Sequence, residues 1–193
     1  MKTCLRIFLC LFLVGVLPAR AAADYKYAHN DAEYSVMLPE APTVETVSVD
    51  NGKVPYLENP PKDIALGEIA AFRRADADTN ESFDVKITFL KADNDFLSKL
   101  TEDKMKTALE SDFKDVNLND KKFDFSVNAD TTLKWATLSG FSIDRYGHPS
   151  YNIGHYLSGK QSILVLKVQY SVENKTFADA YKKLADNITY LAP

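Results

Sequence analysis

The 193 residues carry 27 acidic and 23 basic side chains, which makes the chain acidic, with a net charge of −4. An acidic chain without a cluster of lysine and arginine argues against nucleic acid and anionic membrane as partners, because both are bound by neutralising phosphates. The sequence has no internal repeat, low-complexity tract or long linker. Its composition is that of one ordinary globular domain.

The first 23 residues have the order of a secretory signal peptide: a basic start, an apolar run over 7–17 and a cluster of alanines. The apolar run has 11 residues, whereas a helix that spans a bilayer needs about 20, so the sequence favours cleavage over a retained anchor. Cleavage fits the small-residue rule after Ala21 or Ala23, and we prefer Ala23. We therefore expect a periplasmic or secreted domain over 24–193, without stable membrane insertion.

Both cysteines of the chain, Cys4 and Cys10, lie inside the signal segment. The mature domain then has neither a disulfide nor a thiolate for chemistry. It keeps 20 basic and 27 acidic side chains, a net charge of about −7. About 170 residues can bury enough apolar surface without disulfides, so we expect one packed, cysteine-free domain.

Alternation of apolar and polar residues predicts a series of strands in the mature chain. The segment 83–91 alternates most regularly, with Phe83 and Ile87 pointing inward and Lys86 and Thr88 pointing outward. This pattern is typical of a half-buried antiparallel strand. The other predicted strands cover 25–28, 34–38, 44–49, 53–57, 67–73, 122–127, 133–145, 151–157 and 162–170, with an Asn-Gly hairpin signal at 51–52.

Two amphipathic helices are predicted between and after these strands. The first begins at Thr101, whose hydroxyl can cap it, and the second is capped by Asn174 or Thr176. Their apolar stripes consist of Met105, Ala108, Leu109 and Phe113 in the first helix and Phe177, Ala180, Tyr181, Leu184 and Ile188 in the second. The expected fold class is therefore α+β, an antiparallel β-sheet flanked by two amphipathic helices.

The order of these elements resembles that of the PsbP-like proteins. The resemblance rests on an opening strand and prolines at 34–42, a mid-chain helix, meandering strands that end at 165–170, and a final helix from Phe177. It covers most of the mature chain and includes no diagnostic motif. This family of small exported α+β proteins includes the extrinsic subunit of the photosynthetic oxygen-evolving complex. The resemblance implies a sandwich of sheet and helices and a non-enzymatic role in binding or supporting partners, and it carries over no site residue.

Asp76, Asp78 and Asn80 provide oxygen ligands at alternate positions, which is how a calcium-binding loop begins. The rest of such a loop is missing, because Glu81 stands in place of the glycine that makes the turn and Ile87 in place of the bidentate glutamate. The sequence therefore favours a solvated acidic loop. We expect no metal and no cofactor.

Motifs for catalysis are also missing from the sequence. It contains no nucleophile elbow, no phosphate-binding glycine loop and no dinucleotide fingerprint. His148 and His155 lack the spacing of a zinc-binding pair. The alternative that stays open is an extracytoplasmic hydrolase or metal-dependent enzyme that uses the aspartates near Asp76 or the histidines near His148.

Tyrosines and histidines gather in a polar setting at 146–156, where Gly147 and Pro149 interrupt the strand pattern. Irregular segments of this kind display side chains, and tyrosine supplies rigid amphipathic contact surface. The predicted contact residues are Tyr146, His148, Tyr151, His155 and Tyr156. Trp135 is expected in the core. The sequence thus predicts an exported, non-catalytic binding or accessory domain that contacts a protein or a small-molecule partner.

Overall fold

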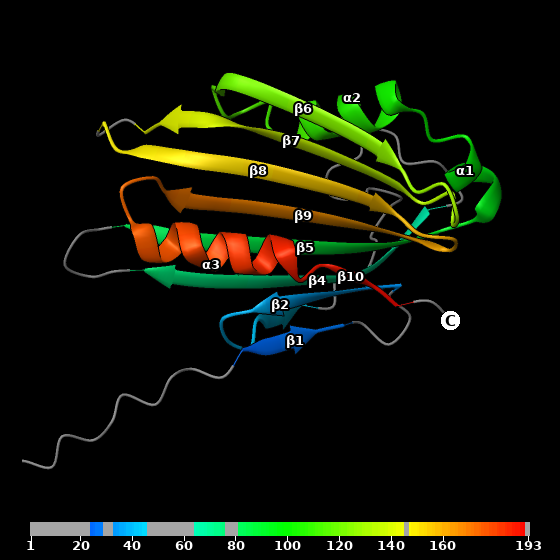
Figure 1. Ribbon diagram of the computed structural model, residues 1–193, viewed down its shortest axis with the longest axis horizontal. Helices are drawn as coiled ribbons and strands as arrows, with labels where there is room; N and C mark the ends of the chain where they lie inside the picture. Colours follow the sequence, from blue (N-terminus) through cyan, green and yellow to red (C-terminus); the bar gives the residue numbers. More distant parts are fainter. Residues whose placement is uncertain (1–23, 29–32, 46–63, 76–80, 145–146, 192–193) are drawn as a thin grey trace, which may run out of the picture.

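The computed structural model of the protein describes residues 24–28, 33–45, 64–75, 81–144 and 147–191 (Figure 1). The signal segment 1–23 and the hairpin signal at 51–52 lie outside these ranges, so both stay predictions. No helix of the described residues has the length and apolar character that a membrane crossing requires.

The strands of the described residues form two antiparallel sheets. Their bounds are β1 (Tyr25–Tyr27), β2 (Tyr34–Leu38), β3 (Thr43–Glu45), β4 (Ile64–Ala75), β5 (Ser82–Ala92), β6 (Asn119–Val127), β7 (Lys134–Ile143), β8 (Pro149–Ser158), β9 (Ser162–Ser171) and β10 (Thr189–Tyr190). The large sheet has the order β3-β4-β5-β9-β8-β7-β6, and the small sheet has the order β1-β2-β10. Strands β6 to β9 follow one another as a meander, whereas β9 pairs with the distant β5.

Three helices occur in the described residues: α1 (Asn94–Ser98), α2 (Glu102–Asp112) and α3 (Lys175–Asp186). The predicted N-caps are confirmed, because the Thr101 side chain accepts a hydrogen bond from the backbone N–H of Lys104 and the Asn174 side chain accepts one from that of Phe177. Asp93 caps α1 in the same way. The segment before α2 is therefore a helix with its own cap.

The helices α2 and α3 lie on opposite faces of the large sheet (Figure 1). Successive residues of a strand point to opposite faces, so β9 supplies side chains to two separate cores. Leu166 and Val168 pack in the core beneath α3 and the small sheet, together with Phe177 and Leu184 of α3. Val165 packs in the other core, beneath α1 and α2.

Helix α2 and the residue that follows it lie close to the sheet at Gly154 of β8. A Cβ atom at this position would lie 2.7 Å from the Cε2 atom of Phe113 and 2.9 Å from the Cδ2 atom of Leu109, which is closer than ordinary van der Waals contact. The absence of a side chain at Gly154 thus lets the last turn of α2 lie directly on β8.

The predicted α+β class and antiparallel pairing are confirmed, whereas the finer arrangement differs from two helices that flank one sheet. The described residues contain a third helix, and α2 and α3 each cover only part of one face. The alternation of β5 predicts that Thr88 points to solvent, which is wrong, because Thr88 is 3 % exposed. The reason is that β5 is a central strand, and the core beneath α1 and α2, which contains Leu90, also covers this face of β5.

Each face of the large sheet therefore has a half on which no described helix packs. On the α3 side this open half consists of β6, β7 and the adjoining part of β8. On the α2 side it consists of one end of β4 and β5, around Arg73 and Lys86. These two open halves hold the candidate sites of the molecule.

Candidate binding site

The predicted contact residues do not form one surface. Tyr146 lies outside the described residues. His148 is exposed in the turn between β7 and β8, where its backbone N–H donates to the Asp144 carboxylate at 2.9 Å. Tyr151 and His155 point to the α3 side of β8, whereas Tyr156 points to the α2 side and is 3 % exposed. Their role in binding stays a prediction, and only Tyr151 and His155 are brought together.

Tyr151 and His155 belong to a larger group of rings on the α3 side, which we call the aromatic cluster. Its members come from β7, β8, β9 and α3: Trp135, Phe141, Tyr151, His155, Tyr170 and Tyr181. Neighbouring ring centroids are 4.7 Å apart for Phe141 and Tyr151, 5.7 Å for Tyr151 and Tyr170, 5.6 Å for Tyr170 and Tyr181, 6.3 Å for Tyr181 and His155, and 5.8 Å for His155 and Trp135. These spacings are typical of interacting aromatic rings.

Strand register creates this cluster. Phe141 on β7 is opposite Tyr151 on β8, and Tyr151 is in turn opposite Tyr170 on β9. Three rings therefore form one row across the sheet, and aromatic pairs of this kind stabilise neighbouring strands. Tyr181 reaches the row from α3, on the face that this helix turns toward the sheet. Trp135 packs against the core as expected and is partly buried.

Hydrogen bonds hold His155 at the centre of the cluster. The Thr137 hydroxyl is 2.9 Å from Nδ1 of His155, and Trp135 Nε1 donates to the same hydroxyl at 3.1 Å. Trp135 Nε1 also lies 3.4 Å from Nδ1, and because an indole nitrogen only donates, this contact places Nδ1 as an acceptor. In that tautomer the imidazole hydrogen is on Nε2, which is 3.2 Å from the Tyr181 hydroxyl oxygen. Burial lowers the pKa of His155 to about 4, so the ring is neutral at pH 7.

The hydroxyl groups of the cluster are uncharged hydrogen-bonding groups. Tyr151 donates to the Ser139 hydroxyl at 3.2 Å. The Tyr181 hydroxyl lies within hydrogen-bonding distance of Nε2 of His155. Burial, reinforced by the neighbouring tyrosines, raises the pKa of both Tyr170 and Tyr181. The cluster thus offers aromatic faces and neutral hydroxyls, which suit a ligand that is itself uncharged at the contact.

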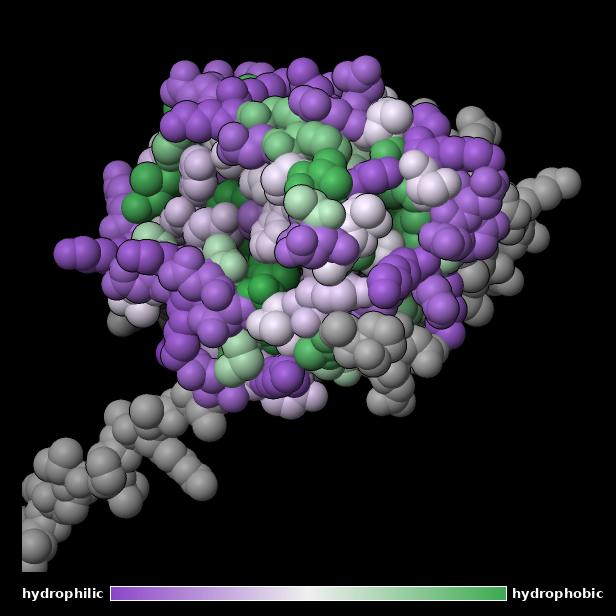
Figure 2. Space-filling model, turned by 45° about the vertical axis from the view of Figure 1, so that its right-hand side comes forward, coloured by the Kyte–Doolittle hydropathy of each residue, from purple (hydrophilic) through white to green (hydrophobic). Residues whose placement is uncertain are grey.

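The cluster is accessible at both of its ends. Phe141 is 38 % exposed and Ile143, two residues further along β7, is 65 % exposed. At the other end Trp135 borders a cavity of about 410 Å³ between the β6–β7 end of the large sheet and the small sheet, where Tyr34 and Tyr190 also line the wall. An oblique view shows hydrophilic residues around much of the rim of the molecule and paler or hydrophobic ones nearer the centre (Figure 2).

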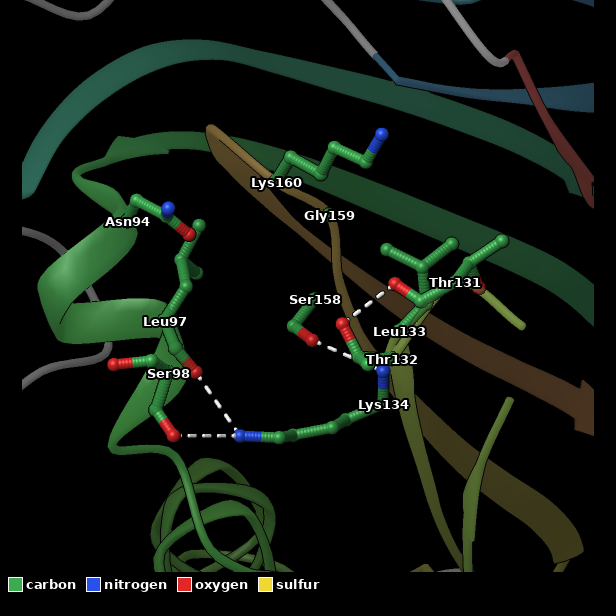
Figure 3. A pocket seen from close by; sticks show the side chains of 10 residues that line it. All are labelled: Asn94, Leu97, Ser98, Thr131, Thr132, Leu133, Lys134, Ser158, Gly159 and Lys160. Carbon is green, nitrogen blue, oxygen red and sulfur yellow. Dashed lines mark hydrogen bonds between the residues drawn. The ribbon is translucent and has the colours of Figure 1, made fainter. Parts of the chain in front are cut away.

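A second, polar cavity of about 220 Å³ lies beside α1 and contains Lys134 (Figure 3). The Lys134 ammonium donates to the carbonyl oxygens of Leu97 and Ser98, each 3.1 Å away. Carbonyl groups at the end of a helix lack partners within the helix, and a cation there stabilises it. Lys134 thus holds the end of α1 against β7, which is a structural role.

The candidate calcium ligands Asp76, Asp78 and Asn80 lie outside the described residues. Within the part of the chain that the structure describes, no group of three or more histidine, cysteine, aspartate or glutamate side chains could hold a metal ion.

Comparisons with known proteins found neither a matching family model nor a matching curated protein. The structure resembles cyanobacterial PsbP. The solution structure of this protein, CyanoP from Synechocystis sp. PCC 6803, matches with a TM-score of 0.49 and 10 % sequence identity over 90 % of this chain and 95 % of that chain. LpqN, described as involved in cell envelope biogenesis of Mycobacterium tuberculosis, matches with a TM-score of 0.42 and 14 % identity over 88 % of this chain and 91 % of that chain. A cyanobacterial PsbP, a member of the family that the order of elements resembles, is thus among the solved structures similar to this chain, and the match transfers no site residue.

Proposed function

We propose that this chain is an exported, non-catalytic accessory domain that binds a segment of a partner protein on the aromatic cluster. Export is supported by the order of residues 1–23, which is that of a secretory signal peptide. The observation that carries the binding role is the accessible row of Phe141, Tyr151 and Tyr170 beside Tyr181. Rigid aromatic side chains with few charged neighbours are the usual energetic centre of protein interfaces.

The partner contacts the face of the sheet and not its edge. Strand β6 forms one edge of the large sheet, and edge strands can pair with a strand of another protein. Here the pairing of β6 is interrupted by a register shift between Asn119 and Lys122, and Asp120 has a positive φ of 50°. Lysines at 121 and 122 add charge to the same end. A bulge and charges of this kind protect an edge against strand addition.

The buried histidine supports binding over catalysis. Both ring nitrogens of His155 are engaged, by Thr137 and by Tyr181, and its low pKa makes it a poor base. His155 is therefore a positioning residue, which fixes the Tyr181 ring and hydroxyl. A neutral, hydrogen-bonded centre with aromatic walls suits the backbone and apolar side chains of a peptide segment.

The test is capture of partners from the native extracytoplasmic fraction by the purified domain and by Tyr151→Ala and Phe141→Ala. We expect each substitution to weaken binding about tenfold or more, because truncation of a central aromatic residue costs about 1–2 kcal/mol or more. Tyr25→Ala is the matched control: Tyr25 is also an exposed tyrosine, 42 % accessible, but lies on the small sheet. Variants are compared only after thermal denaturation shows that they are folded.

Undiminished capture by the folded Tyr151→Ala and Phe141→Ala variants would contradict the proposal, as would equal losses in Tyr25→Ala. Capture of no protein at all would also contradict it. Native mass spectrometry of the domain from its natural source tests for a small ligand in place of a protein partner. A bound small molecule that is lost in Tyr151→Ala would show that the aromatic cluster binds a small ligand.

A further inference from the structure

A cavity of about 380 Å³ lies on the opposite face of the large sheet from the aromatic cluster, over the open end of β4 and β5. Its volume falls within the range of about 300–1,000 Å³ that is usual for small-ligand sites. One wall consists of Phe113 and Val116, which follow α2, and the floor consists of side chains from β4, β5, β8 and β9. The wall and part of the floor are apolar.

The floor of this cavity is built by strand register. Ala71 on β4 is opposite Lys86 on β5, and Lys86 is opposite Lys167 on β9. Two lysines therefore stand directly opposite each other on neighbouring strands and on the same face. Like charges in this position destabilise a sheet. An anion in the cavity would interact favourably with both lysines and relieve this repulsion.

Two carboxylates act on these lysines: that of Asp112 at the end of α2, which is buried, and that of Asp115, which interacts with Lys167. Lys167 donates to the backbone carbonyl of Asp112 at 2.8 Å, and its ammonium is 4.0 Å from Oδ1 of the same residue. Oδ1 of Asp112 is buried and accepts no hydrogen bond. Oδ1 of Asp112 thus interacts with the Lys167 ammonium by charge and not through a hydrogen bond.

Among the residues that line the cavity, cations outnumber carboxylates. Arg73 and Asp84 both line the cavity and form an ion pair, with 3.2 Å between Nε and Oδ1. The lining therefore contains three cations and one carboxylate, in a protein whose net charge is −4. The Lys167 ammonium also lies 5.1 Å from the centroid of the Phe113 ring, so the positive charge and the apolar wall adjoin.

We infer that this cavity binds a small amphipathic anion, whose apolar body packs against Phe113 and Val116 and whose carboxylate or phosphate group lies beside Lys86 and Lys167. The charge of the lysines favours an anionic headgroup, and the apolar wall favours a ligand with an apolar chain. The site is independent of the aromatic cluster, because the two lie on opposite faces of the sheet.

The test uses two ligands of the same chain length, decanoate and decanol, with binding measured by isothermal titration calorimetry at pH 7.5 and low ionic strength. We expect one decanoate per chain, bound at least about tenfold more tightly than decanol, because only the carboxylate of decanoate can form ion pairs with the lysines. The variant Lys86→Gln should weaken decanoate binding about tenfold and leave decanol unchanged. Val116→Ser should weaken both ligands, because it removes apolar contact from the wall.

Two controls keep the result specific. Lys122→Gln removes an exposed lysine from β6 and should leave decanoate binding unchanged, and so should Tyr151→Ala in the aromatic cluster. Equal affinity for decanoate and decanol would overturn the inference, as would full decanoate binding by the folded Lys86→Gln variant. Failure of decanoate to bind at millimolar concentration would also overturn it, whereas the partner-binding proposal would be unaffected.

Discussion

The two open halves of the large sheet are built from the same strands and differ in chemistry. On β8, Tyr151 points into the aromatic cluster and the adjacent Asn152 lines the cationic cavity. On β9, Tyr170 belongs to the aromatic cluster and Lys167 lines the cavity on the opposite face. Helices α2 and α3 cover different parts of opposite faces. Each helix therefore leaves a different set of strand side chains uncovered. One sheet thus presents an uncharged aromatic surface on one face and an apolar, positively lined cavity on the other.

A buried titratable side chain lies next to each of the two candidate sites, and burial disfavours the charged form of both side chains. His155 lies beneath the aromatic cluster, and Asp112 lies beside the cationic cavity. Burial lowers the pKa of the histidine to about 4 and raises the pKa of the aspartate to about 6, in the second case against the opposing effect of Lys167 and Lys86. The two groups therefore make the stability of the fold depend on pH in opposite directions.

The largest expected change in stability comes from comparing substitutions on the two faces of strand β5. Ile87 is 1 % exposed in the core beneath α3, and Ile87→Asp should unfold the domain, because burying an unpaired carboxylate costs several kcal/mol out of a total of about 5–15 kcal/mol. Lys86→Gln, one residue earlier on the open α2 side, should unfold at nearly the parent temperature. Thermal denaturation followed by circular dichroism measures both, and equal shifts would contradict the register of β5.

The next effect concerns His155. Its pKa is about 4 in the folded protein and 6.5 in the unfolded chain, so its stabilising contribution is fully present above pH 6.5 and is lost as the pH falls toward 4. A difference of this size corresponds to about 3 kcal/mol. His155→Gln should therefore lose less stability than the parent between pH 7 and pH 4 in urea unfolding. A parent and variant with the same pH dependence would show that His155 is not buried as described.

Asp112 should make stability depend on pH in the opposite direction, by a similar or smaller amount. Its pKa is about 6 in the folded protein and 3.8 in the unfolded chain, so the folded state holds the proton more tightly and stability falls as the pH rises from 3.8 to 6. Charging Asp112 in the fold then costs about 3 kcal/mol at pH 7. Asp112→Asn should gain stability relative to the parent as the pH is raised from 4 to 7. A loss over that range would mean that the ion pair with Lys167 outweighs burial.

The smallest effect is expected at the accessible end of the aromatic cluster. Ile143 is 65 % exposed, and Ile143→Ser should change the free energy of unfolding by no more than about 0.5 kcal/mol, as surface substitutions usually do. Urea denaturation at pH 7 gives this value directly. A loss of several kcal/mol would show that this end of β7 is packed against another part of the chain and is not a contact surface.

Short-range patterns in the sequence predicted the parts of the fold that depend on short-range interactions. The caps at Thr101 and Asn174 each bind a backbone N–H three residues later, so the residues concerned are close together in the printed sequence. The shared face of Trp135 and Phe141 follows from the two-residue period of a strand. The same period places His155 and Tyr156 on opposite faces of β8, so these neighbours in sequence do not belong to one contact surface.

The tertiary structure alone decided which side chains meet across the sheet. The pairing of Tyr151 with Tyr170 and that of Lys86 with Lys167 depend on which strands are neighbours and in which register. The coverage of Thr88 depends on where α1 and α2 pack. Strand order, register and helix placement result from the packing of segments that are far apart in the chain, and many arrangements are compatible with the same local alternation. The sequence by itself therefore determined most of the described elements and the alternation of their side chains, and the packing of those elements determined the two candidate sites.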